Sequence, residues 1–151
     1  MGITVQFFSK YGNGDNGYDH ISLWSYNRMN GTAFQHFSIN DYFCDTWARL
    51  AHAAAAFSIV GISFIFIAFA LSLLTPTMPH LRVPTGLVSL VASLALVITV
   101  GITIALYQRQ YCNNHYLVLA QDGFNLASGF GLTVAAFSLC FIGGILRIAM
   151  P

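Results

Sequence analysis

Histidine, cysteine and carboxylate side chains are the groups in this 151-residue chain whose types and spacing could support metal or acid–base chemistry. No two histidines stand three or four residues apart, and the three cysteines lack the paired spacing of a structural zinc site. The chain has no Glu to form a paired-carboxylate site, and it has neither a nucleophile elbow nor a phosphate loop. We therefore expect no enzyme activity, no metal site and no cofactor other than a bound lipid. The five histidines are expected to be surface or interfacial residues: His20, His36, His52, His80 and His115.

Composition indicates the environment in which the elements must fold. Hydrophobic residues make up 56% of the chain and charged residues only 7%, whereas soluble domains carry about a quarter charged residues. A chain dissolved in lipid needs no charged coat, so this shortage predicts an integral membrane protein. The six basic residues are scattered singly, which excludes nucleic acid as a partner.

The distribution of apolar residues predicts an all-α integral membrane protein with three transmembrane helices, at residues 47–74, 84–107 and 124–149. The first would be about 42 Å long at 1.5 Å per residue, against a hydrocarbon core of about 30 Å. Two prolines in the short loop 75–83, with Pro84 at the start of the second helix, separate the first two helices, and a polar loop covers 108–123. Residues 1–46 form a polar N-terminal cap that we expect to have little regular structure.

Three spans place the cap and the 108–123 loop on one side, with the proline loop and the C-terminus opposite. All five aspartates then share the cap side. Lysine and arginine near the helix ends leave the positive-inside rule tied, because Arg49 and Arg109 on the cap side balance Arg82 and Arg147 opposite.

The cap side also carries the residues that covalent modification could use. Cys44 and Cys112 both fall close to helix ends on that side, so a disulfide between them is sterically conceivable, and two free thiols are an equal alternative. Asn30 begins an Asn-Gly-Thr glycosylation sequon, which matters only if the cap enters the secretory lumen.

Small residues recur at helical spacing on each predicted span, and such stripes let helix backbones approach closely. We interpret them as packing positions within one three-helix unit, although membrane helices in general are rich in small residues. Four phenylalanines of the first span, at 57, 64, 66 and 69, would then face lipid or a partner. The expected packing positions are Ser58, Gly61, Gly86, Ser89, Ser93, Gly131 and Ala135.

The order of short motifs resembles a known family. Thr4-Val-Gln-Phe7 looks like a segment that follows the family's first helix, and Ser22-Leu23-Trp24 looks like the centre of its loop signature. Residues 53–59 and 128–137 are similar to its second and fourth helices. The family is that of the amastins, four-helix surface membrane proteins distantly similar to claudins, and the resemblance covers most of the chain.

The chain departs from the amastin pattern at three points. The family's two signature cysteines fall on His20 and Asn30, its signature glycine falls on Ser25, and its first transmembrane helix has no counterpart here. The resemblance implies that the cap lies on the outer face beside the second loop.

These features support three functional hypotheses. The leading one is a non-catalytic accessory subunit of a multi-protein membrane complex, with other membrane subunits and lipids as its partners. The complex would be an energy-transducing one, and the mitochondrial inner membrane is favoured over the plasma membrane as its location. The first alternative is an amastin-like cell-surface protein. The second is a small-molecule or lipid transporter, which would need a polar cavity and which lacks the usual ionisable residues inside the spans.

Overall fold

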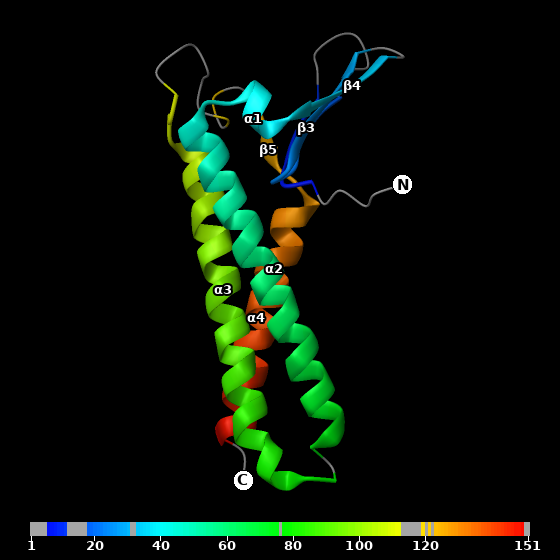
Figure 1. Ribbon diagram of the computed structural model, residues 1–151, viewed down its shortest axis with the longest axis vertical. Coiled ribbons are helices and arrows are strands. Elements are labelled where there is room, and N and C mark those ends of the chain that lie inside the picture. The colour runs from blue at the N-terminus through cyan, green and yellow to red at the C-terminus, as the bar shows by residue number, and fades with distance from the viewer. Residues whose placement is uncertain are drawn as a thin grey trace. The chain divides into compact units, whose positions relative to one another are not determined.

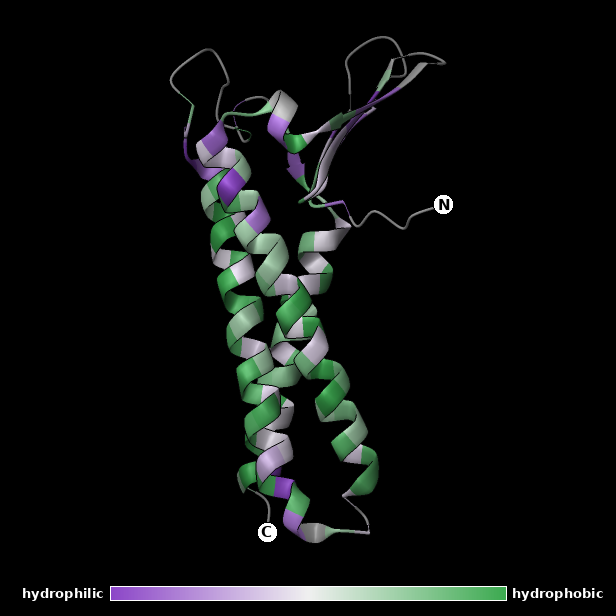
Figure 2. Cartoon of the chain, in the orientation of Figure 1, coloured by the Kyte–Doolittle hydropathy of each residue, from purple (hydrophilic) through white to green (hydrophobic). Residues whose placement is uncertain are grey.

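The structure is a computed structural model that describes residues 6–11, 18–30, 33–75, 77–112, 119, 121 and 123–149. Its long elements are the helices α2 (Asp45–Leu74), α3 (Arg82–Gln108) and α4 (Ser128–Ala149), shown in Figure 1. Each is long and apolar enough to cross a membrane, and Figure 2 shows hydrophobic residues along all three. The predicted three apolar helices, each long enough to span a membrane, are confirmed.

The ends of the helices follow local sequence signals. Asp45 is an acidic residue in the first turn of α2, where the helix dipole favours negative charge. A short 3-10 helix, η1 (Pro79–Leu81), leads directly into α3 at Arg82. The helix α4 begins at Ser128 rather than Phe124, because the intervening residues Asn125–Leu126 pair with a strand of the cap.

The N-terminal segment has much more regular structure than the sequence predicts. It contains strands β1 (Phe8–Tyr11), β2 (Tyr18–Ile21), β3 (Ser25–Asn30) and β4 (Ala33–Ser38), followed by the short helix α1 (Ile39–Tyr42). With β5 (Asn125–Leu126) the strands form an antiparallel sheet in the order β4-β3-β2-β1-β5. We use "the cap" for these five strands with α1 and the turns that the structure describes between them.

A row of apolar residues across the sheet explains why these short segments pair. Phe8 pairs with Ile21, and Ile21 pairs with Tyr26 on the next strand. Tyr26 in turn pairs with Phe37 of β4. Residues directly opposite on neighbouring strands lie on one face of a sheet and pack against each other. The first three of these side chains are buried, so the row forms the centre of the cap's hydrophobic core.

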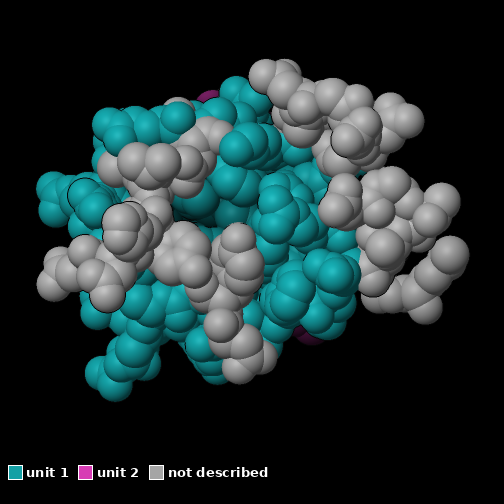
Figure 3. Space-filling view, turned by 90° about the horizontal axis from the view of Figure 1, so that it is seen from above, with its two compact units in different colours: residues 1–55, 100–132 teal, residues 56–99, 133–151 magenta. Residues whose placement is uncertain are grey.

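The chain divides into two compact units. Unit 1 comprises residues 1–55 and 100–132, and unit 2 comprises residues 56–99 and 133–151. Unit 1 therefore contains the cap with the adjoining turns of the three helices, and Figure 3 shows its surface in teal. Unit 2 contains the remaining length of the same three helices.

Close helix packing in unit 2 occurs at three glycines. A Cβ on Gly86 would lie 2.6 Å from Cγ1 of Ile148 and 3.0 Å from the carbonyl oxygen of Gly144. A Cβ on Gly61 would lie 2.8 Å from Cδ2 of Leu96. Helices α3 and α4 therefore cross with their backbones close together at Gly86, and α2 packs on α3 where Gly61 meets the side chain of Leu96.

The other expected packing positions divide between buried and exposed sites. Ser93 is buried, and the hydroxyl of Ser58 donates to Oγ1 of Thr99 at 3.4 Å. Ser89 is half-buried and lines a cavity described below. Gly131 and Ala135 are exposed, and a Cβ at Gly131 would meet nothing within 4 Å, contrary to the packing expected for them. The reason is that α4 approaches α3 at Gly144 and not along the small residues of its first turns.

Candidate functional site

A disulfide between Cys44 and Cys112 is the central covalent feature of unit 1. Cys44 directly precedes α2, and Cys112 lies four residues beyond the end of α3. Their Cα atoms are 5.8 Å apart, within the range that a disulfide requires. The bond joins segments 68 residues apart, so it fixes the entry to α2 against the exit from α3.

Aromatic side chains hold the sheet against the helix ends of the same unit. The ring of Phe8 stacks on that of Tyr107 with centroids 5.9 Å apart, and the Tyr107 hydroxyl donates to the carbonyl oxygen of Phe124 at 2.9 Å. Phe43 stacks on the buried Trp47 with centroids 4.0 Å apart. These contacts connect α3, α2 and the segment before β5, so the cap has a fixed hydrophobic base.

The predicted motif Ser22-Leu23-Trp24 forms the turn between β2 and β3. The buried hydroxyl oxygen of Ser22 accepts hydrogen bonds from the backbone N–H groups of Trp24 and Ser25, at 3.2 and 3.0 Å. The Ser22 N–H donates to the carbonyl oxygen of Ser25 at 2.9 Å. The turn buries Leu23 and leaves Trp24 52% exposed, so it presents one large aromatic side chain to the surroundings.

Polar cross-strand pairs lie on the sheet away from this core. Nε of Arg28 is 3.5 Å from Oδ1 of its strand partner Asp19. His36 Nδ1 and the side-chain oxygen of its strand partner Asn27 are 2.6 Å apart. β4 is the outermost strand of the sheet, and its side chains Gln35, His36 and Ser38 are exposed. The outermost strand of a sheet presents unpaired backbone groups that can pair with another chain.

The predicted sequon occupies the connection between two paired strands. Asn30 is the last residue of β3, and its strand partner Ala33 is the first residue of β4. Residues 31 and 32, as well as the side chain of Asn30, lie outside the described residues. Glycosylation of Asn30 therefore stays a prediction.

Few residues in the described parts of the chain are candidates for acid–base catalysis or metal binding. Among those residues no group of three His, Cys, Asp or Glu side chains could hold a metal ion. His52 Nε2 lies 3.1 Å from the side-chain oxygen of Asn40. His20, which stands where the amastin signature has a cysteine, stacks on Tyr18, and its buried Nδ1 has no hydrogen-bond partner among the residues that the structure describes.

Sequence reasoning missed several residues that shape this site. Phe8, Tyr26 and Tyr107 form its core, yet strands of four to six residues show too short an alternation for a periodic signal. The tyrosines were the one sequence feature that indicated strands here, because aromatic residues are enriched in strands. Tyrosine hydroxyls also usually form hydrogen bonds when they are buried.

One comparison with known proteins identifies a family for this chain. The model of the amastin family, described as Amastin surface glycoprotein, matches residues 1–146. No curated protein matches the chain. The match extends through the sheet of the cap and all three apolar helices, as the resemblance of the motifs predicts. The chain belongs to the amastin family.

Proposed function

We propose that this membrane protein is a cell-surface protein that displays its disulfide-linked cap outside the membrane as a contact surface. The observation that carries the proposal is the Cys44–Cys112 disulfide. Disulfides persist in secreted and surface-exposed proteins, whereas glutathione and thioredoxin keep cytosolic thiols reduced. Both cysteines lie beside helix ends of unit 1, so the side of the membrane that oxidises them is also the side that holds the cap.

The family description supports the same location. Amastins are described as surface glycoproteins, which favours the cell-surface alternative over the mitochondrial inner membrane. The description gives no support for a respiratory complex. The positive-inside rule is tied for this chain, so the disulfide provides the sharper argument for orientation.

The cap offers contact rather than catalysis. Trp24 at the β2–β3 turn is half-exposed, and the edge strand β4 presents Gln35 and His36. Tryptophan is enriched at the centres of protein interfaces because it buries a large area on binding. We therefore assign the cap a binding role toward a partner outside the membrane and assign no catalytic role to the chain.

The proposal is tested by labelling thiols on intact cells with a membrane-impermeant maleimide, with and without an impermeant reductant. We expect Cys44 and Cys112 to react only after reduction, and without permeabilising the cells. The variant Cys112→Ser should make Cys44, the less buried of the two, reactive without reduction, and Cys140→Ser controls for the remaining thiol. Labelling that requires permeabilised cells, or a free Cys44 thiol in the native protein, would overturn the surface orientation.

The accessory-subunit hypothesis rests on a different observation. Phe57, Phe66 and Phe69 of α2 are exposed, at 38%, 69% and 61%. Such an apolar surface packs against either lipid or another membrane subunit. Native electrophoresis of membranes solubilised in a mild detergent distinguishes the two. Migration in one large stoichiometric complex would favour the subunit hypothesis, and migration alone or as a small oligomer would favour the surface protein.

The transporter hypothesis receives little support from the helices. Every Asp, Lys and Arg in α2, α3 and α4 lies within about five residues of a helix end: Asp45, Arg49, Arg82 and Arg147. Ion and proton pathways usually place ionisable groups at membrane depth. The three fully described helices hold no Asp, Glu, Lys or Arg there, so we do not assign transport.

A further inference from the structure

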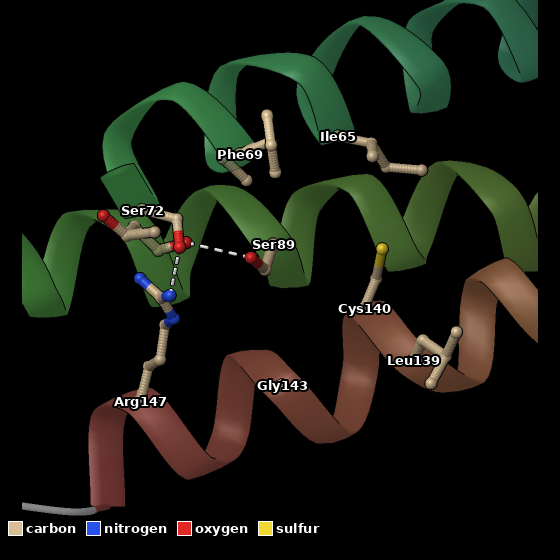
Figure 4. Close-up of a pocket in the computed structure, with 10 residues that line it drawn as sticks. Ile65, Phe69, Ser72, Ser89, Leu139, Cys140, Gly143 and Arg147 are labelled. Atoms are coloured by element: carbon tan, nitrogen blue, oxygen red, sulfur yellow. Dashed lines mark hydrogen bonds between the residues drawn. The ribbon is translucent and has the colours of Figure 1, made fainter. Parts of the chain in front are cut away.

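Unit 2 contains a cavity of about 220 Å³ between α2, α3 and α4. Its wall includes Ile65, Phe69, Ser72, Leu139, Gly143 and Arg147 (Figure 4). Arg147 is the one charged side chain among the described residues that line it. Neither the cap nor the disulfide contributes to the cavity, so its properties do not depend on the proposed orientation of the cap.

The guanidinium of Arg147 has neutral partners in this cavity. Nη2 donates to Oγ of Ser72, and Nη1 donates to Oγ1 of Thr75 at 3.4 Å. Figure 4 shows the side chain reaching from α4 toward Ser72 of α2. The ion pairs of the described residues are both in unit 1 and do not include Arg147.

Unit 2 has no acidic side chain that could neutralise this arginine. Its residues, 56–99 and 133–151, include Arg82, Arg147 and His80 but no Asp or Glu. A half-buried cation beside apolar helices is costly without a counter-charge. No acidic side chain of unit 2 can therefore supply the missing negative charge.

The cavity is polar at one end and apolar at the other. Arg147 and Ser72 each lie two residues before the end of their helix, α4 at Ala149 and α2 at Leu74, where helix ends meet the headgroups. Ile65 and Cys140 lie seven residues further into the same helices, or about 10 Å at 1.5 Å per residue. Figure 4 shows the same order along the helices, from Arg147 and Ser72 to Ile65 and Cys140.

We propose that this cavity binds an anionic phospholipid, with the phosphate on Arg147 and the start of one acyl chain against Ile65 and Phe69. Arginine presents a planar fork of donors that matches two phosphate oxygens, and the Ser72 hydroxyl can reorient to donate a further hydrogen bond. The volume of about 220 Å³ accommodates the phosphate and the first part of a chain, while the rest of the lipid stays in the bilayer. A net negative headgroup is preferred because it supplies the counter-charge that no side chain of unit 2 supplies.

Two variants distinguish the contribution of the Arg147 charge to lipid binding from the contribution of the cavity volume. Arg147→Gln removes the cation and keeps a hydrogen-bonding side chain. Gly143→Leu keeps Arg147 but fills the cavity, and it should fold because a Cβ on Gly143 meets nothing within 4 Å. Their matched controls are Arg82→Gln, at an exposed arginine of α3 outside the cavity wall, and Gly131→Leu, at an open position of α4 outside it.

The experiment measures lipid retention by the full chain in mild detergent, by native mass spectrometry, during titration with phosphatidylglycerol or phosphatidylcholine. We expect phosphatidylglycerol to bind more tightly, and Arg147→Gln to weaken its affinity about tenfold, as loss of one charge-assisted phosphate contact predicts. Gly143→Leu should also weaken its affinity, because the leucine side chain occupies the space of the acyl chain. The controls should bind as the unaltered chain does. Helix content by circular dichroism confirms that each variant is folded.

Three outcomes would overturn the assignment. Unchanged affinity of both cavity variants would show that the lipid binds elsewhere. If phosphatidylcholine were retained as strongly as phosphatidylglycerol, the site would have no preference for a negatively charged headgroup. Displacement of the lipid by equimolar inorganic phosphate would show that the site binds a free anion and that the acyl chain does not contribute to the affinity.

Discussion

At the scale of single residues, Ser22 shows how one hydroxyl sets the geometry of the cap. Its buried oxygen accepts two backbone N–H groups within the β2–β3 turn. The same turn directs Leu23 into the core and Trp24 outward. Serine side chains commonly stabilise such turns by bonding backbone groups two or three residues on.

Replacing Ser22 with Ala should destabilise the cap by about 1–3 kcal/mol, the usual cost of leaving buried backbone donors without partners. The measurement is the free energy of unfolding of the purified chain in mixed detergent micelles. Ser38→Ala is the matched control, because Ser38 is exposed and makes no side-chain capping hydrogen bond to α1. Equal stability of the two variants would contradict the structural role of the Ser22 hydroxyl.

At the scale of elements, the helices were predictable from sequence and the sheet was not. Long apolar runs bounded by prolines and polar loops leave few alternatives to a membrane helix, because lipid offers no partners to exposed backbone groups. The strands are shorter, and their pairing depends on contacts between distant segments. β5 consists of two residues, Asn125 and Leu126, whose strand character comes only from their pairing with β1.

The same contrast holds for the packing and cavity residues. Small residues suggested close approach on every helix, but only the structure shows which of them meet another backbone. Gly86 and Gly144 do, whereas Gly131 faces open space. Arg147 was visible in the sequence as a single basic residue near a helix end, but its hydroxyl partner Ser72 lies 75 residues away and has no sequence signal.

Gly144→Val tests the α3–α4 crossing. A Cβ at this position would lie 3.1 Å from the backbone oxygen of Gly86, which cannot move without shifting α3. Overpacking of this kind usually costs about 1–3 kcal/mol, so we expect a corresponding loss of stability in detergent unfolding experiments. Gly131→Val introduces the same side chain on the same helix into open space and should have little effect. A larger loss at Gly131 than at Gly144 would mean that α4 packs through its first turns.

At the scale of the whole molecule, charge is divided unevenly along the chain. All the aspartates belong to unit 1, where two of them form ion pairs with Arg28 and Arg49. Unit 2 has only basic and neutral side chains. The side chains of unit 2 therefore leave its arginines without a counter-charge, which fits a negatively charged lipid headgroup at its helix ends.

The disulfide acts on this whole arrangement, and its removal should loosen the cap without unfolding the helices. A loop of 68 residues corresponds to roughly 4 kcal/mol in a free chain. The membrane lowers this value, because α2 and α3 stay inserted and keep their ends near each other even in a partly unfolded chain. We therefore expect Cys112→Ser to speed proteolysis of the cap in lipid nanodiscs while circular dichroism shows unchanged helix content.

Cys140→Ser, at the cysteine outside the disulfide, is the control and should leave both measurements unchanged. Equal protease resistance of Cys112→Ser and the unaltered chain would show that the aromatic base formed by Phe8, Tyr107 and Trp47 holds the cap by itself.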